Sequence, residues 1–162
     1  TARAAEKMRR QRSAATVISV FLRTNPFKDT PQYHNGVQAK LPVPSDLTNE
    51  LNFYATKGLE QIFREDFMFQ KVGVMLSGLV PKDNAQPGLF DEVDRVKMSA
   101  VMKVMDKINM EWGSETLFFA GAGNKKSWKM RREKKSPHYT TNWNELPNVL
   151  ADQRTANQLK LF

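Results

Sequence analysis

The sequence predicts an α+β fold in which two helices cover one face of a small antiparallel or mixed sheet. Residues 16–24, 37–43 and 69–80 have the β-branched content or the alternation of strands, and residues 2–12 and 44–66 have helical patterns. Helices and strands in this order bury their apolar surfaces by stacking both helices on one side of the sheet. A complete split β-α-β arrangement would require one more strand before residue 1.

The two helical segments are predicted from apolar side chains at helical spacing. In the first segment, Ala2, Ala5 and Met8 share one side. The second opens with a capping signal at Ser45 or Asp46. Apolar residues with the helical period follow this signal: Leu47, Leu51, Tyr54, Ala55, Leu59, Ile62 and Phe63. Because the chain starts inside a helical pattern, TARAAEKMRRQR, we expect it to be a C-terminal piece of a longer protein.

The three strand segments carry apolar residues on one face and polar residues on the other. Residues 37–43 alternate strictly, and Pro42 favours an edge position or a strand end. If the apolar side chains face the helices, the opposite face presents small polar and basic side chains: Ser19, Arg23, Gln38, Lys40, Lys71 and Ser77. Such a face is either an ordinary solvated surface or a surface against which a DNA backbone lies.

After the third strand the sequence predicts a smaller set of elements. Residues 82–92 form a polar linker, and residues 93–147 form a small domain with a helix, a short strand over 115–120 and a basic helix. One apolar stripe of its first helix consists of Val93, Val96, Ala100, Val104 and Ile108. The methionines of this helix are expected to fill core space. Residues 148–162 have little periodicity and are expected to form a flexible tail.

The formal net charge of +8 is concentrated in one segment. Residues 125–135, KKSWKMRREKK, hold seven basic residues and one glutamate, which is a net charge of +6. Such a density indicates a polyanionic partner, most often nucleic acid, and its plain alternative is a solvated helix face. The hydrophobic content of 40% suffices for a core, and the absence of cysteine excludes disulfides and thiolate metal sites. No apolar run approaches the roughly 20 residues of a membrane span.

Residue patterns typical of catalysis are absent from the sequence. It contains no Gly-rich phosphate loop and no nucleophile with a neighbouring base, and its two histidines, His34 and His138, are far apart. The carboxylate pair Asp91 and Glu92 falls in the linker, where nothing would hold its geometry. We therefore expect no catalytic residue, no metal site and no cofactor in this chain.

Several stretches resemble a known family. The segments ARAAEKMRRQ, VISVFLRTNPF and KVGVMLSGLVP resemble the little-finger domain of Y-family translesion DNA polymerases, in particular the UmuC-like branch. The segment GSETLFFAGAGNKKSWKMRREKKSPHYTTNWNELP is similar to the short C-terminal domain of unknown function that follows the little finger in UmuC-like proteins. The resemblance covers residues 2 to about 147, and MRREKKSPHYTTNW is its most specific part.

The resemblance implies a non-catalytic part of a bacterial, cytoplasmic enzyme of SOS mutagenesis and DNA repair. In this family the polymerase reaction belongs to a palm domain with metal-binding carboxylates, where Mg²⁺ is expected, and the palm lies N-terminal to the little finger. The little finger, here residues 1–81, lies along the template–primer duplex and contacts mainly backbone phosphates. Arg23, Lys40 and Lys71 would form the equivalent DNA-binding surface.

The resemblance also suggests a role for the linker segment DNAQPGLFDE, residues 83–92. UmuC-like polymerases carry a pentapeptide of the type Gln-x-x-Leu-Phe after the little finger, which docks on the sliding clamp. Gln86, Leu89 and Phe90 occupy that place. The alternative is that Leu89 and Phe90 hold the linker onto the next helix. A second candidate for clamp binding closes the sequence: Gln158, Leu159, Leu161 and Phe162.

The basic run has two candidate partners. It could bind DNA phosphates, with Trp128 stacking on a base, or it could dock the protein partners that the family implies, the recombinase filament and the processed UmuD dimer. Its main candidate residues are Lys125, Lys126, Lys129, Arg131 and Arg132. Trp143 is expected in the core of the small domain. Two functions follow: a polymerase region that binds DNA and the clamp, or a protein-interaction module whose basicity is incidental.

Overall fold

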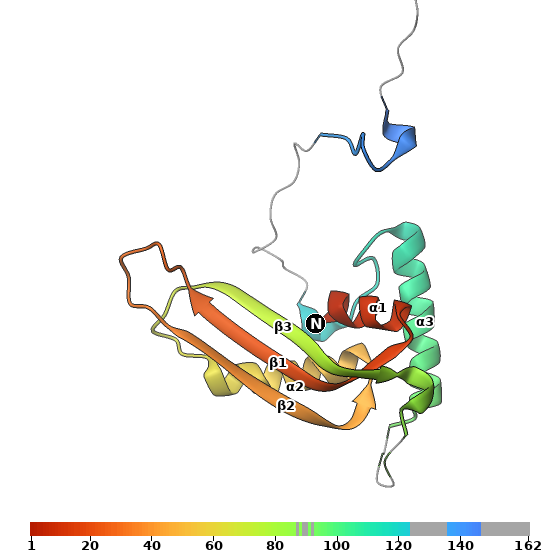
Figure 1. Cartoon of the computed structure of the whole chain (residues 1–162), viewed down its shortest axis with the longest axis horizontal. Coiled ribbons are helices and arrows are strands. Elements are labelled where there is room, and N and C mark those ends of the chain that lie inside the picture. The colour runs from red at the N-terminus through yellow and green to blue at the C-terminus, as the bar shows by residue number, and fades with distance from the viewer. Residues whose placement is uncertain (87, 89–90, 92, 124–135, 147–162) are drawn as a thin grey trace, which may run out of the picture. The chain divides into compact units, whose positions relative to one another are not determined.

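The structure is a computed structural model that describes residues 1–86, 88, 91, 93–123 and 136–146 (Figure 1). The chain divides into two compact units, Thr1–Asn124 and Lys125–Phe162. In the first unit the described elements are α1 (Ala2–Arg10), β1 (Ser13–Thr24), β2 (His34–Ser45), α2 (Thr48–Ile62), β3 (Phe69–Pro81), the 3₁₀ turn η1 (Lys82–Asn84), α3 (Arg95–Trp112) and the 3₁₀ turn η2 (Ala120–Ala122). The second unit contributes the 3₁₀ turn η3 (Trp143–Glu145).

The three strands form one antiparallel sheet in the order β2-β1-β3, with β1 in the centre. Ile18 lies opposite Ala39 on β2 and Leu76 on β3, so apolar residues of all three strands share one face. A bulge between Ala15 and Val17 shifts the pairing with β2, and Ala15 therefore joins the same core as Ile18. The predicted α+β class, with helices packed on a small antiparallel sheet, is confirmed.

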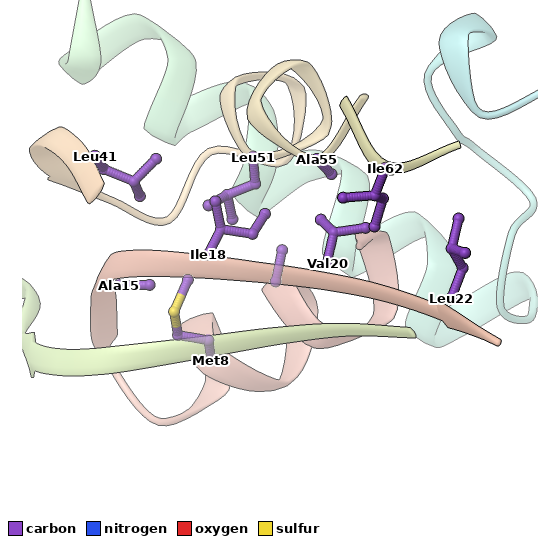
Figure 2. Close-up of a cluster of buried hydrophobic side chains, with 10 residues drawn as sticks. Met8, Ala15, Ile18, Val20, Leu22, Leu41, Leu51, Ala55 and Ile62 are labelled. Atoms are coloured by element: carbon purple, nitrogen blue, oxygen red, sulfur yellow. The ribbon is translucent and has the colours of Figure 1, made fainter. Parts of the chain in front are cut away.

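The main core lies between β1 and the two helices α1 and α2. Figure 2 shows Ile18 and Val20 of β1 directed toward Leu51 and Ala55 of α2. The other buried members of this cluster are Ala5, Met8, Ala15, Leu22, Leu41 and Ile62. Each large apolar side chain removed from water contributes about 1.5–3 kcal/mol. This burial, rather than intrinsic helix propensity, therefore holds the two helices on the sheet.

Helix α2 begins later than its predicted capping signal. Its N-cap is Leu47, which makes no side-chain cap. The Ser45 hydroxyl accepts a hydrogen bond from the Leu47 backbone N–H (3.2 Å) and donates to the Glu50 carboxylate. Asp46 binds Lys82, which lies far along the chain. The predicted cap at Ser45 or Asp46 is therefore wrong, because both side chains are engaged by other partners.

Helix α3 packs in the same compact unit as the sheet. Its Met102 and Met105 are buried together with Leu47, and Met98 and Phe119 pack against this second cluster. The prediction that methionines fill core space is confirmed for Met102 and Met105, whereas Met110 is 70% exposed. The division into segments 1–81, 82–92, 93–147 and 148–162 stays a prediction about function, since in its packing α3 belongs with the sheet.

The valine stripe of α3 lies on the exposed side of the helix. Val96 is 85% exposed and Val104 is 58% exposed. Both sides of the helix are apolar, so the periodicity alone does not distinguish them. The ion pairs that Arg95 forms with α2 and Asp106 forms with α1 turn the methionine side inward.

Three further predictions about apolar segments are wrong. Residues 115–120 form turns instead of a strand, because both backbone groups of Leu117 bond to the side-chain amide of Asn109 (2.8 and 2.9 Å). Phe63 is half exposed, since it caps the C-terminal end of α2 with extended backbone. Trp143 is 86% exposed in η3, a turn held by polar contacts of Glu145. The predicted basic helix over 125–135 lies outside the described residues.

Candidate nucleic-acid interface

The sheet face opposite the helices carries three of the residues predicted to bind DNA. Directly paired residues of antiparallel strands lie side by side on the same face. Four such rows cross the sheet from β2 through β1 to β3: His34–Arg23–Lys71, Gly36–Phe21–Gly73, Gln38–Ser19–Met75 and Lys40–Val17–Ser77. We call these twelve positions the open face.

The first row brings three side chains that can carry positive charge next to one another. Arg23, His34 and Lys71 are all exposed. Paired residues lie about 4.5–5.5 Å apart between their Cα atoms, so the ends of these side chains can converge on one anion. Lys40 is also exposed but lies at the other end of the face, roughly 20 Å away along the strands. The sequence places Arg23 and Lys71 on one face but misses His34, because β2 starts before the predicted residue 37.

The second row makes the middle of the open face flat. The half-buried Phe21 ring lies over Gly73, where any Cβ would collide with it. On the other side of β1, a Cβ on Gly36 would lie 3.4 Å from the Phe21 Cβ. An isolated glycine inside a strand is a sequence signal for such close approach, and Gly73 carries that signal in the segment KVGVML. The result is a shallow, partly apolar strip between the two basic ends.

A hollow of about 320 Å³ adjoins the first row of the open face. It is lined by Arg23, Thr24, Pro26, Gln32, Tyr33 and His34. The loop that forms it is held by the side-chain amide of Gln32, which lies 2.9–3.0 Å from three carbonyl oxygens of the same loop, those of Asn25, Lys28 and Thr30. The basic end of the open face is therefore built on an internally bonded loop rather than on a loose connection.

The linker that contains the first clamp-like motif is attached to the fold by an ion pair at a residue that precedes the motif. Lys82 Nζ lies 2.5 Å from Asp46 Oδ2, which joins the start of the linker to the segment before α2. Gln86, the first residue of the motif, is exposed. Its apolar partners Leu89 and Phe90 lie outside the described residues, so both interpretations of the motif stay predictions.

The linker is also tied down directly after the motif. The Arg95 guanidinium binds the carboxylates of Asp91 and of Glu50, the latter at 3.2 Å. The hydrogen bond from Arg95 holds the pKa of Asp91 below its ordinary value. Burial alone would lower the pKa of Arg95, but its hydrogen bonds to Asp91 and Glu50 raise it above the ordinary value. Both partners are therefore charged at neutral pH, and the end of the linker is fixed to α2.

The remaining predicted site residues lie outside the described residues. They are Lys125, Lys126, Lys129, Arg131 and Arg132 of the basic run and Gln158, Leu159, Leu161 and Phe162 of the second clamp-like motif. Their assignment to DNA, to a protein partner or to the clamp stays a prediction.

A metal site is not found in the part of the chain that the structure describes. There, no group of three or more histidine and acidic side chains is arranged to hold a metal ion. His138 instead takes part in a local turn, where its backbone N–H donates to Glu145 (2.5 Å) and its ring Nδ1 lies 3.7 Å from the same carboxylate. Within the same described ranges, every helix is too short or too polar to cross a membrane.

Comparison with known families shows to which family the chain belongs. Residues 1–89, more than half of the chain, match the impB/mucB/samB family C-terminal domain. The chain belongs to this family. Residues 99–149 match a second family model, DUF4113, which is described as a domain of unknown function. The predicted relationship to UmuC-like proteins is thereby confirmed.

Three curated relatives illustrate the extent of the similarity. Protein ImpB of Salmonella typhimurium is 40% identical over 147 residues, Protein MucB of Escherichia coli is 44% identical over 149 residues, and Protein UmuC of Salmonella typhimurium strain LT2 is 38% identical over 150 residues. These alignments cover 90–91% of this chain but only 34–36% of each relative. The chain thus spans about a third of the length of these relatives. No solved structure matches the chain significantly.

Proposed function

We propose that this chain is the DNA-binding and sliding-clamp-tethering region of a translesion DNA polymerase that acts in SOS mutagenesis and repair in the bacterial cytoplasm. Membership in the impB/mucB/samB family supports the proposal. The observation that carries it is the open face, with the row His34–Arg23–Lys71 at one end and Lys40 at the other. The polymerase reaction and its Mg²⁺ belong to a palm domain outside this chain.

The dimensions of the open face suit a DNA duplex. Its two basic ends lie roughly 20 Å apart, while the major groove is about 12 Å wide. The ends can therefore reach phosphates on both walls of the groove, and the Arg23 guanidinium can bind a phosphate through two parallel hydrogen bonds. Between them the flat strip around Phe21 offers few groups that could read bases. Such contacts hold DNA without regard to its sequence, as bypass of damage requires.

The linker motif suits a weak tether to the clamp. Burying one leucine and one phenylalanine in an apolar clamp pocket contributes on the order of 3–6 kcal/mol before ordering costs. The ion pairs of Lys82 and Arg95 fix both ends of the linker, so less conformational freedom remains to be lost on docking. The expected result is reversible attachment, which lets the polymerase take over a primer end and then leave.

The DNA-binding part is tested by removing charge from the open face. We expect Arg23→Gln with Lys71→Gln to weaken binding of a primed duplex about tenfold. The slope of log affinity against log salt concentration should become less negative by up to about 1.8, since each neutralised phosphate contributes about −0.9 to it. The matched control, Lys57→Gln with Lys97→Gln, removes the same charge from exposed positions on α2 and α3. Equal losses in both variants would contradict the assignment of the open face.

The clamp part is tested by truncating the linker motif. Leu89→Ala with Phe90→Ala should weaken binding to the sliding clamp by at least tenfold and leave duplex binding unchanged, measured by surface plasmon resonance on immobilised clamp. If the clamp affinity is unaltered until Leu161 and Phe162 are also removed, the C-terminal motif is the one in use.

One observation favours a second candidate function, that of a protein-interaction module. The exposed side of α3 carries apolar residues, among them Val96, Val104 and Trp112, and exposed apolar surface of this kind is typical of protein-binding sites. Its partner would be the recombinase filament or the processed UmuD dimer. Binding through this stripe should barely change with salt and should be lost in Val96→Ser with Val104→Ser, whereas duplex binding should be unaffected.

A further inference from the structure

A basic pocket lies beyond the end of β1 that is opposite to Arg23. It opens between α1, the turn before β1, η1 and α3, and its volume is about 590 Å³. This volume falls within the range of about 300–1,000 Å³ that is typical of ligand pockets. Among the lining residues that the structure describes, six are basic and three are acidic. The pocket therefore combines a cavity of useful size with an excess of positive charge.

Two of the three acidic residues are already paired inside the pocket. Arg9, whose side chain is only 7% exposed, binds both carboxylate oxygens of Asp106 at 2.7 Å. Lys82 Nζ lies 2.5 Å from Asp46 and 2.7 Å from the Ser99 hydroxyl. These pairs join α1, η1 and α3 into a fixed floor. They neutralise each other and leave the charge of the rim uncompensated.

The rim of the pocket is where this charge is available. Arg12 and Lys103 are exposed and form no ion pair within the described part of the chain. In the same described part, Arg10 pairs only with Glu6, one turn away on the same helix. Asp83 is the third acidic residue and is exposed. The rim thus has cationic groups, those of Arg12 and Lys103, that are available to bind an anion.

The backbone of Arg12 adds an independent observation. Its φ is 51°, in the left-handed region that disfavours residues with a Cβ. The position is held by two hydrogen bonds, from the Arg12 N–H to the Arg9 carbonyl oxygen (2.9 Å) and from the Lys82 N–H to the Arg12 carbonyl oxygen (2.8 Å). Glycine would fit this turn with less strain. This turn ends α1 and holds the Arg12 residue at a fixed position beside the pocket.

We propose that this pocket binds a phosphate group of a single-stranded nucleic acid, as a contact separate from the open face. The inference rests on the proposed DNA-binding function and adds a second point of attachment. Guanidinium groups match phosphate oxygens in geometry as well as charge. The described lining contains no aromatic side chain on which a base could stack, so the contact is made to the backbone. An acidic peptide is the weaker occupant, because Met110 is the one apolar side chain that it could cover among the described lining residues.

Two methionines allow the pocket and the open face to be observed separately. Met110 lines the pocket and Met75 lies on the open face, and both are exposed. In the whole chain labelled with methyl-¹³C methionine, the oligonucleotide dT20 should shift the Met110 methyl signal. A blunt duplex should shift the Met75 signal. Met110→Leu and Met75→Leu assign the two signals.

The decisive variant removes the free charge of the rim. Arg12→Gln with Lys103→Gln should abolish the Met110 shift, weaken dT20 binding about fivefold or more, and flatten its salt slope by about 0.7–1.4, since single strands give about −0.7 per phosphate. Lys57→Gln with Lys97→Gln is the matched control. Equal dT20 affinity and salt dependence in the two variants would contradict phosphate binding in the pocket. So would a Met110 signal that dT20 leaves unshifted in the unmodified chain. A greater response of Met110 to polyglutamate than to dT20 at equal charge overturns the choice of ligand.

The same data separate this inference from the proposed function. In one outcome, the duplex leaves the Met75 signal unshifted while dT20 shifts the Met110 signal in a way that depends on Arg12 and Lys103. This result supports phosphate binding in the pocket and contradicts DNA binding by the open face. If the duplex shifts the Met75 signal and dT20 leaves the Met110 signal unshifted, DNA binding by the open face is supported and phosphate binding in the pocket is contradicted. Thermal unfolding followed by circular dichroism verifies that each variant is folded, and the exposed positions of Arg12 and Lys103 make this the expected result.

Discussion

The two clusters of the first compact unit are held together by different forces. Ten buried, uncharged residues of the described chain form the core between β1, α1 and α2. Helix α3 is held by a cluster with three buried residues, by the ion pairs Arg9–Asp106 and Arg95–Glu50, and by a hydrogen bond from Lys82 to Ser99. The stabilisation by ion pairs depends on salt and pH, whereas the stabilisation by apolar burial depends on them much less. We therefore expect α3 to loosen under conditions in which the sheet and its helices stay folded.

The largest effect is expected in the main core. Leu51→Ala should lower the free energy of unfolding by about 3–5 kcal/mol, because it removes a fully buried side chain and leaves a cavity. Urea unfolding followed by circular dichroism measures the change. Thr56→Ala, at an exposed position of the same helix, is the control. A loss below 1 kcal/mol would mean that the sheet and α2 are less closely packed than the cluster indicates.

A smaller and more local effect is expected where α3 is attached. Asp106→Asn leaves the buried Arg9 guanidinium without its carboxylate, and we expect a loss of about 1–3 kcal/mol. Hydrogen exchange should accelerate in α3 and stay unchanged in α2. Asp83→Asn removes an exposed carboxylate of the same type and should have little effect. Equal acceleration in both helices would show that α3 and the sheet unfold as one cooperative unit.

The open face should tolerate a change that leaves both clusters intact. Gly73→Ala forces the Phe21 ring off β3, but a ring at the end of a side chain can move, so we expect a loss of about 1 kcal/mol or less. Aromatic NMR signals of Phe21 should shift while the melting temperature changes by a few degrees. A loss as large as that of Leu51→Ala would assign the Phe21 contact to the stabilising core rather than to the surface.

The smallest effect concerns Asp91. Because Arg95 holds the pKa of Asp91 below its ordinary value, this carboxylate stabilises the fold above about pH 4 and loses that contribution as the pH falls through its lowered pKa. Asp91→Asn should therefore be less stable than the unmodified chain at neutral pH, and the difference should shrink in acid. Melting temperatures from pH 7 to pH 2.5 measure it. A difference that is constant with pH would exclude an electrostatic role for Asp91.

Periodicity alone identified the buried side of elements with a single apolar side, but not of the element with two. Strands β1 and β3 and helices α1 and α2 have one apolar face, so their periodicity identifies the buried side. Helix α3 has valines on one side and methionines on the other, so its buried side was predicted from the residue type of the methionines and not from the periodicity. For the candidate site, the period of two along the strands was enough to put Arg23 and Lys71 on a common face. His34 needed the register of the β1–β2 hairpin, which the residue pattern does not contain.

The sequence by itself determined that the segments of α1, α2 and the three strands become helices and strands and which strand face is polar and basic, because these properties follow from the local spacing of side chains. Only the tertiary structure decided how α3 is attached to the rest of the first unit and which basic residues stand together in the pocket. The physical reason is that these choices depend on contacts between residues far apart in the chain, such as Arg9 with Asp106 and Glu50 with Arg95. Such contacts form only after the main core has brought the helices and strands together.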